Sequence, residues 1–204
     1  MCEHHEDYEL LDLPTLSVGD TVPNFEFDAF KPGDKEELTK MSIEDFKGKW
    51  LVLFFYPADF TFVCPTELEE MAGMYPEFQK EGVEVVSVST DTHFSHKAWH
   101  DSSEAIKKIT FPMAADANHI LSESFGVLIE EEGLALRGTF VINPEGNIVL
   151  AEINDNSIGR NANELLRKIR AAKFVAEHDG LVCPASWKPG DDTLEPGLDL
   201  VGKI

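Results

Sequence analysis

The chain is short of cysteines and of basic residues, and it has no long apolar run. Its three cysteines, Cys2, Cys64 and Cys183, are an odd number without a Cys-x-x-Cys spacing, which argues against a structural disulfide framework and against a metal site. The longest apolar run, residues 50–56, is far too short to span a bilayer. No secretory leader is visible at the start, so we expect a cytoplasmic protein without a membrane partner.

Basic residues number 17 against 38 acidic ones, which gives a formal net charge of −21 over 204 residues. This imbalance repels nucleic acid and anionic membranes, whereas a small uncharged substrate meets no electrostatic barrier. The hydrophobic content of 43% and the charged content of 27% are ordinary for a globular protein and exclude a wholly disordered one. In a reducing compartment, isolated cysteines are more often catalytic or redox-active than structural.

The composition divides the chain into three parts. Residues 1–13 form an acidic tail with five Asp or Glu, two His and no Lys or Arg. Residues 14–178 carry the periodic segments of one folded domain, and residues 179–204, which are rich in Pro and Gly, are expected to form an extended C-terminal arm. If Met1 is removed, Cys2-Glu3-His4 offers nitrogen ligands that suit Cu(II) or Ni(II), but a plain tail is the favoured interpretation.

The predicted elements alternate between strands and helices. The run at 50–56 does not alternate in polarity, which is typical of a central strand buried on both faces. The other predicted strands are at 24–27, 83–89, and 139–142 with 148–151, the last two forming an antiparallel hairpin. Helices are predicted from Cys64 onward with a kink or break at Pro76, at 93–109 and at 163–177, after a short helical turn at 42–46.

This order of elements predicts a thioredoxin-like α/β fold, a mixed sheet with helices on both sides. In open α/β sheets, chemistry gathers outside the carboxyl ends of the parallel strands. Cys64 follows the first core strand and starts a helix, so it lies where such chemistry is expected.

Cys64 is the residue that local physics marks as reactive. Pro65 suits the first helical position, which makes Cys64 the predicted N-cap, near free amide groups and the positive end of the helix dipole. Both favour the thiolate, which is the nucleophilic form of cysteine. Glu67 can turn back towards the cap, but alone it opposes a thiolate, so we expect a cationic partner. An arginine is the natural choice, and the residues alone do not say which one.

Two neighbours complete the local interpretation. The Thr61 hydroxyl is placed to accept a hydrogen bond from a peroxide and to donate one to the sulfur, and Pro57 is placed to stiffen the loop and shield the sulfur. The alternative is that Cys64 is an inert buried thiol, since free cysteines are often small core residues. No histidine lies in this segment, so a Cys–His protease pair is not supported locally.

The pattern Pro57-x-x-x-Thr61-x-x-Cys64 resembles the active-site motif of peroxiredoxins. The wider segment 54–68 is similar to the bacterial alkyl hydroperoxide reductase branch of that family, and so are the segments at 89–94, 96–100, 166–169 and 199–204. The resemblance implies a typical two-cysteine peroxidase, in which Cys64 attacks the peroxide and becomes a sulfenic acid. Cys183, in Val182-Cys183-Pro184, is the implied resolving cysteine, which would form a disulfide with Cys64 of another subunit.

The same resemblance assigns further residues and partners. Arg137 matches the active-site arginine, and Arg160 matches an arginine that pairs with Glu67. The family implies no metal, flavin or haem on the chain, a homodimer that assembles into a decamer, and a reductant that is either a flavoprotein or a thioredoxin-like protein. Its substrates would be hydrogen peroxide and organic hydroperoxides.

Two rival functions stay open at the level of sequence. A ring-shaped holdase chaperone would protect unfolded proteins without using Cys64. A thiol–disulfide oxidoreductase would need a Cys-x-x-Cys pair, and here the second position is Glu67, so this alternative ranks well behind.

Overall fold

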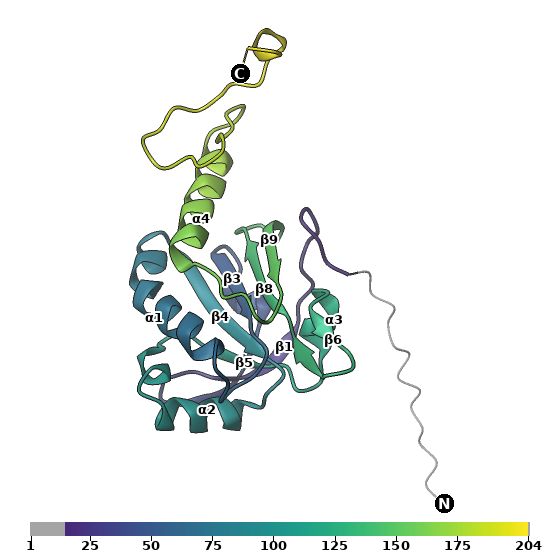
Figure 1. Ribbon diagram of the computed structural model, residues 1–204, viewed down its shortest axis with the longest axis vertical. Helices are drawn as coiled ribbons and strands as arrows, with labels where there is room; N and C mark the ends of the chain where they lie inside the picture. The colour runs from purple at the N-terminus through teal and green to yellow at the C-terminus, as the bar shows by residue number, and fades with distance from the viewer. Residues whose placement is uncertain (1–14, 204) are drawn as a thin grey trace, which may run out of the picture.

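The structure is a computed structural model that describes residues 15–203 (Figure 1). The predicted acidic tail, with the interpretation of Cys2-Glu3-His4 as a metal ligand, lies outside the described residues. In the described part the strands are β1 (Glu26–Phe30), β2 (Leu38–Ser42), β3 (Trp50–Phe55), β4 (Val83–Ser89), β5 (Met113–Ala115), β6 (Leu128–Ile129), β7 (Leu134–Ala135), β8 (Arg137–Ile142) and β9 (Ile148–Asn154). The helices are α1 (Cys64–Lys80), α2 (His93–Ser102), α3 (Ile120–Ser124) and α4 (Ala162–Glu177), with short 3₁₀ turns η1 (Ile43–Phe46), η2 (Ile106–Lys108) and η3 (Leu198–Leu200).

Seven strands form one mixed sheet in the order β2-β1-β5-β4-β3-β8-β9. The neighbours β3, β4 and β5 run parallel, while β1, β2, β8 and β9 pair antiparallel with their neighbours. The predicted mixed sheet and the β8–β9 hairpin are confirmed. Because β3 and β4 lie at the centre, the end of β3 opens directly onto the middle of the carboxyl edge of the sheet.

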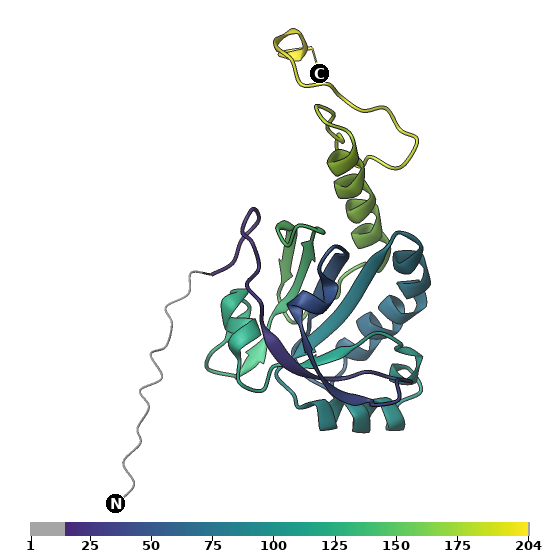
Figure 2. The ribbon, with the colours of Figure 1, turned by 180° about the vertical axis from the view of Figure 1, so that it is seen from behind.

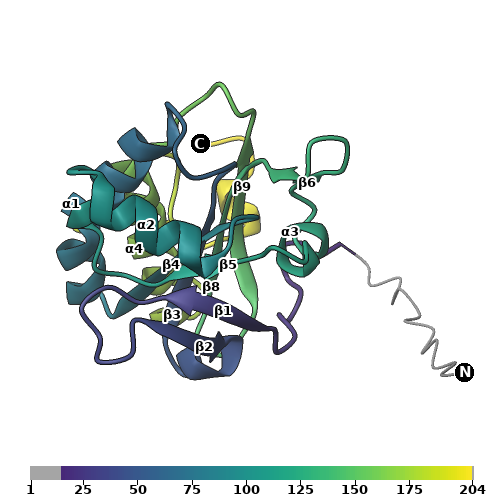
Figure 3. The same ribbon diagram turned by 90° about the horizontal axis from the view of Figure 1, so that it is seen from below.

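Strand β3 is buried on both faces, as its unbroken apolar sequence predicts. Alternate side chains point to opposite sides of a strand, so β3 contributes to two separate hydrophobic clusters. The first cluster packs against α1, α2 and α4, and the second packs against η1 and α3. Figure 3 shows α1, α2 and α4 on one side of the sheet and α3 on the other. Figure 2 shows η1, in dark blue, in front of the sheet. Strand β3 contributes Trp50, Val52 and Phe54 to the first cluster and Leu51, Leu53 and Phe55 to the second.

Two helix predictions were wrong in their extent. A kink or a break was predicted at Pro76, and helix α1 continues through it, so there is no break; Met71, Tyr75 and Phe78 are buried along the same helix, and this packing offsets the hydrogen bond that proline removes. Helix α2 ends at Ser102 instead of running to residue 109. The Ser102 hydroxyl donates to the carbonyl of Ala98 within the last turn, a bond that weakens helix continuation.

The structure also contains strands that the sequence did not signal. Strand β1 begins two residues later than predicted, while β2, β5, β6 and β7 were not predicted. Three of these four have only two or three residues, and β2 is a partly exposed edge strand. Their pairing is set by neighbouring strands rather than by a hydrophobic pattern of their own. No helix within residues 15–203 combines the length and the apolar character needed to cross a membrane.

Gly138 is a tight packing point between β8 and the rest of the core. A Cβ atom there would lie 2.8 Å from Val127 Cγ1 and 3.0 Å from Phe140 Cε2. We expect Gly138→Ala to lower the free energy of unfolding by about 1–3 kcal/mol, because the surrounding side chains are buried and rigid. Urea denaturation measures this change.

The matched control is Gly73→Ala, in the exposed middle of α1, where a Cβ meets nothing within 4 Å. That change should stabilise the protein by about 0.5–1 kcal/mol, because alanine is the better helix former. Equal effects of the two substitutions would contradict the packing role of Gly138.

Candidate active site

Cys64 lies at the carboxyl edge of the sheet, at the start of α1, and its side chain is 0% exposed. Its predicted N-cap position was wrong by one residue. Val63 is the cap, although its angles, φ −82° and ψ −38°, are already helical; Cys64 is the first helical residue and Pro65 follows it. The Val63 carbonyl accepts hydrogen bonds from the amides of Thr66 (3.0 Å) and Glu67 (3.3 Å), so these amides are not free to face the sulfur.

The donor that reaches the sulfur is a guanidinium. Arg137 Nη1 lies 3.4 Å from Cys64 Sγ, and the Arg137 side chain is only 3% exposed. Arg137 is the first residue of β8, which pairs with β3 in the sheet, and this pairing brings it beside the loop that follows β3. A buried guanidinium stays protonated, so it places a fixed positive charge against the thiol.

Glu67 lies between two arginines and uses both of its carboxylate oxygens. Oε2 accepts from Arg137 Nη1 (2.6 Å) and Arg160 Nη2 (3.0 Å), and Oε1 accepts from the Arg160 backbone amide (2.8 Å) and Nε (2.9 Å). A carboxylate has about four lone-pair sites, and here four donors occupy them. Glu67 therefore turns towards the arginines and not back towards the helix cap.

The pKa shifts in this cluster follow from burial and pairing. Burial pushes the pKa of Glu67 upward, but the hydrogen bonds and charge of Arg160 outweigh it, and the pKa lies below its usual value. Burial lowers the pKa of Arg160, and Glu67 opposes that shift. Two guanidiniums and one carboxylate leave one positive charge without a partner in a buried place. A thiolate at Cys64 would neutralise it.

Arg160 is held in place on several sides. Its guanidinium carbon lies 3.4 Å from the centre of the Phe54 ring, and Nη1 donates to the Gly138 carbonyl (2.7 Å) and to Thr139 Oγ1 (3.0 Å). The planar, fork-shaped guanidinium suits this combination of stacking and multiple hydrogen bonds. The site thus joins the ends of β3 and β8 to the β9–α4 connection.

One member of the site could not be predicted from the sequence. The backbone carbonyl of Asn156, in the β9–α4 connection, accepts from Arg137 Nε (3.0 Å) and Nη2 (2.7 Å). These bonds aim the remaining nitrogen, Nη1, at Glu67 and Cys64. Every residue has a carbonyl, so no side-chain pattern signals this role.

Thr61 and Pro57 lie in the loop that leads to Cys64. The Thr61 hydroxyl donates to the Ala58 carbonyl at 2.8 Å, so the predicted donation to the sulfur is not what the structure has. A hydroxyl has one proton and two lone pairs, and the lone pairs stay available as acceptors. Pro57 is buried and is the second residue after β3.

Cys183 lies in the C-terminal arm against α4, and both it and Cys64 are free thiols. Its Sγ is 3.8 Å from the Ala171 carbonyl, in a hollow lined by Trp50, Val149 and the small side chains of α4. Burial raises the pKa of the Cys183 thiol, while Arg167 acts in the opposite direction. The two sulfurs therefore stand in different settings, one against a guanidinium and one in an apolar hollow.

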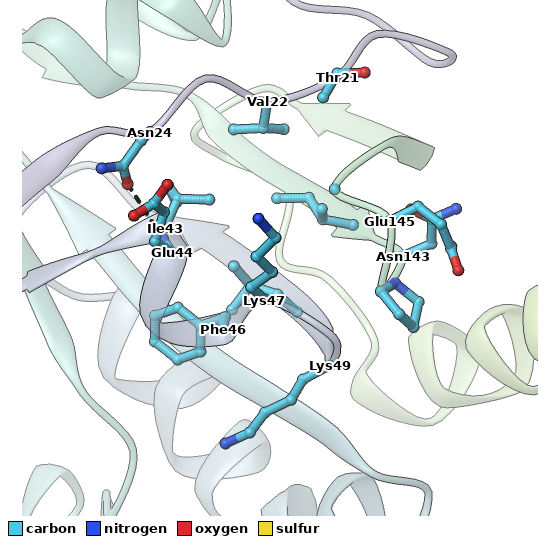
Figure 4. Close-up of a pocket in the computed structure, with 14 residues that line it drawn as sticks. Thr21, Val22, Asn24, Ile43, Glu44, Phe46, Lys47, Lys49, Asn143 and Glu145 are labelled. Atoms are coloured by element: carbon cyan, nitrogen blue, oxygen red, sulfur yellow. Dashed lines mark hydrogen bonds between the residues drawn. The ribbon is translucent and has the colours of Figure 1, made fainter.

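The pocket in Figure 4 lies at the other end of β3. Lys49 and Leu51, at the amino end of that strand, line it together with Phe46 and the β8–β9 turn, and none of the residues around Cys64 takes part. Within residues 15–203, no group of three or more His, Cys, Asp or Glu side chains is placed to hold a metal ion. The candidate site is therefore the Cys64 cluster and not this pocket.

Residues 18–151 match the model of the AhpC/TSA family, and residues 171–201 match that of the C-terminal domain of 1-Cys peroxiredoxin. The chain belongs to the AhpC/TSA family. The second segment of this family member includes Cys183, so two of its cysteines lie within the matched regions. The resemblance to peroxiredoxins is confirmed.

Relatives of this AhpC/TSA protein match it over nearly their whole length. It is 56% identical over 187 residues to alkyl hydroperoxide reductase C of Pseudomonas aeruginosa, covering 92% of this chain and 98% of that one. The crystal structure of Enterococcus faecalis AhpC is similar with a TM-score of 0.79 and 50% identity, over 83% of this chain and 100% of that one. The crystal structure of reduced Plasmodium vivax 2-Cys peroxiredoxin is similar with a TM-score of 0.81 and 30% identity, over 86% of this chain and 91% of that one. The thioredoxin-like fold is thereby confirmed.

Glu67→Gln tests the charge cluster. The variant leaves two buried guanidiniums without their shared counter-charge, so we expect a loss of about 3 kcal/mol in the free energy of unfolding at neutral pH. The pKa of the Glu67 carboxyl is lower in the folded protein than in the unfolded chain, where it is about 4.3. The stability that ionised Glu67 contributes is therefore fully present above the unfolded-state pKa and is lost as pH falls through the folded-state pKa. The difference between the two proteins should therefore shrink in acid.

Urea unfolding across this pH range, at one protein concentration, measures both effects. The control is Glu69→Gln on the same helix, whose partner is the exposed Lys108. It should change stability by less than about 1 kcal/mol. An equal loss in both variants would contradict the account of the cluster.

Proposed function

We propose that the chain is a thiol-dependent peroxidase that reduces hydrogen peroxide to water and organic hydroperoxides to alcohols. The observation that carries the proposal is the Cys64 thiol, buried at the start of α1 with Arg137 Nη1 3.4 Å from its sulfur. The excess positive charge of the cluster favours the thiolate, the nucleophilic form. Membership of the AhpC/TSA family supports the same reaction.

In the first step, the Cys64 thiolate attacks the terminal oxygen of ROOH. The new S–O bond forms as the O–O bond breaks, the departing alkoxide takes a proton and leaves as ROH, and Cys64 becomes a sulfenic acid. Arg137 stabilises the charge that develops on the peroxide oxygens, because it is fixed by Asn156 and Glu67 before the substrate arrives.

Thr61 and Pro57 act on the substrate side of this step. With its proton committed to the Ala58 carbonyl, the Thr61 hydroxyl presents its lone pairs, which can accept a hydrogen bond from the peroxide O–H. Pro57 holds the loop at its junction with β3 and keeps water from the sulfur. Glu67 and Arg160 hold Arg137 in position.

In the second step, the Cys183 thiol attacks the Cys64 sulfenic acid, so that an S–S bond forms and water leaves. A disulfide requires Cα atoms within about 7 Å, and Cys64 is fully buried at a helix start, so the first turn of α1 must unwind. Cys183 lies in a hollow that Trp50, at the amino end of β3, helps to line, whereas Cys64 follows the carboxyl end of that strand, and the chain beyond Cys183 runs on past the end of α4 (Figure 1). This placement favours a bond between two subunits.

The proposal extends to partners and organisation. A disulfide reductant, either a flavoprotein or a thioredoxin-like protein, supplies two thiol hydrogens and resets both cysteines. The subunits form homodimers that assemble into a decamer in the cytoplasm. Residues 14–178 form the peroxidase domain, residues 179–204 form the resolving arm, and no metal or organic cofactor takes part.

Cysteine substitutions test the two steps. Wild type mixed with hydrogen peroxide should yield a disulfide-linked dimer on a non-reducing gel, and both Cys64→Ser and Cys183→Ser should abolish it. In stopped-flow tryptophan fluorescence, Cys183→Ser should keep the fast first phase and lose the second. Cys64→Ser should lose both, because only Cys64 reacts with peroxide.

Other outcomes would favour other functions. A fast first phase in Cys64→Ser would contradict the assignment of the reactive sulfur. Full protection of an unfolded client by Cys64→Ser, together with a wild type that does not consume peroxide, would favour a holdase chaperone.

A further inference from the structure

A second buried polar cluster lies behind the active-site loop, and the mechanism above does not use it. The Tyr56 hydroxyl donates to Asp59 Oδ1 at 2.7 Å, and His96 Nδ1 lies 2.8 Å from Asp59 Oδ2. His96 Nε2 lies 3.1 Å from the carbonyl oxygen of Ala114 on β5. Tyr56 and His96 are 0% exposed and Asp59 is 6% exposed.

The protons of this cluster follow from its partners. A carbonyl oxygen only accepts, so His96 Nε2 carries a hydrogen. Asp59 Oδ1 is taken by Tyr56, which leaves Oδ2 facing His96 Nδ1, and one proton must lie between these two atoms. Without it, two lone pairs would face each other in the protein interior. Asp59 and His96 thus share a proton and have no net charge as a pair.

Asp59 is also anchored through its backbone. Its amide donates to Asp91 Oδ2 at 2.8 Å, and that carboxylate also accepts from the Ser89 hydroxyl at the end of β4. The next residue, Phe60, has a left-handed backbone with φ +55°, and its ring lies 5.8 Å from that of Trp99 on α2. A non-glycine residue holds such a conformation only where its surroundings fix it.

These contacts join the loop at 57–63 to β4, β5 and α2. Asp59 lies two residues after Pro57 and two before Thr61, and the Thr61 hydroxyl is itself bonded to Ala58 in the same loop. A shift of Asp59 is therefore passed on to Thr61 and to the start of α1. Since near-attack geometry tolerates little displacement, a shift of about 1 Å is enough to slow a reaction by about 10²-fold.

We propose that Asp59 and His96 are positioning residues for peroxide reduction, which hold the loop in the conformation from which Thr61 and Cys64 meet the substrate. This inference rests on the proposed function. Neither side chain touches the sulfur; the His96 imidazole is held between Asp59 and the Ala114 carbonyl. The charged and titratable groups that surround the pair are Tyr56 after β3 and Asp91 between β4 and α2.

The test compares two reactions of the same sulfur. In a Cys183→Ser background, the rate constant for hydrogen peroxide depends on the loop geometry, whereas alkylation by iodoacetamide needs only an accessible, ionised thiol. We expect Asp59→Ala to slow the peroxide reaction by about 10–100-fold and to change alkylation by less than about 3-fold. Asp59→Asn should restore most of the peroxide rate, because its amide accepts from Tyr56 and donates to a neutral His96.

Asp116→Asn is the matched control. Asp116 is a carboxylate of 1% exposure that accepts from the amides of Leu121 and Ser122 at the start of α3, neither of which belongs to the Cys64 cluster or to the loop at 57–63. It should keep the wild-type peroxide rate. If Asp59→Ala fails to fold, Tyr56→Phe removes a single hydroxyl from the cluster and should still slow the peroxide reaction several-fold relative to alkylation.

A wild-type peroxide rate in Asp59→Ala, or an equal fall of both rates, would overturn the inference. A wild type that does not react with peroxide would instead overturn the proposed function, so the two failures are distinguishable.

Discussion

The site depends on one buried carboxylate that holds two guanidiniums together. Glu67 accepts four hydrogen bonds from Arg137 and Arg160, and all three side chains are at most 4% exposed. Buried charges are unfavourable unless they are paired and fully hydrogen-bonded, so the cluster is stable only as a unit. Its composition leaves one positive charge over, and Cys64 Sγ is beside it. The charge that the reaction needs is thus a consequence of how the cluster is paired.

The sheet brings these groups together from distant parts of the chain. Cys64 and Glu67 begin α1, Arg137 begins β8, and Arg160 lies in the connection before α4. Pairing of β8 with β3 places Arg137 beside the end of β3, and Phe54 on β3 provides the ring on which Arg160 stacks. On the other side of the loop, the Asp59–His96 pair ties it to α2. The loop at 57–63 therefore lies between two buried polar clusters, the arginine cluster at the start of α1 and the pair of Asp59 with His96 on α2.

The sequence predicted the parts of the fold that have a strong hydrophobic signal. Strands β3 and β4 are apolar and buried, so their positions were predicted almost to the residue, whereas β2, β5, β6 and β7 are short or partly exposed and depend on their neighbours. The start of α1 was misplaced because nothing in a valine indicates that it adopts helical angles before the helix. Arg137 and Arg160 were selected only through family resemblance. The Asn156 carbonyl and the Asp59–His96 pair went unnoticed, since backbone groups and contacts distant in sequence leave no local pattern.

In the proposed reaction, the unpaired guanidinium charge beside Cys64 Sγ makes the sulfur reactive by stabilising negative charge on it. The most direct measurement is the ultraviolet absorbance of the thiolate at neutral pH, together with the peroxide rate constant, in Cys183→Ser and in the same protein with Arg137→Met. We expect a thiolate signal that depends on Cys64, and we expect Arg137→Met to lose this signal and to react with peroxide about 10²-fold more slowly or worse. An unchanged signal and rate after removal of the guanidinium would contradict it.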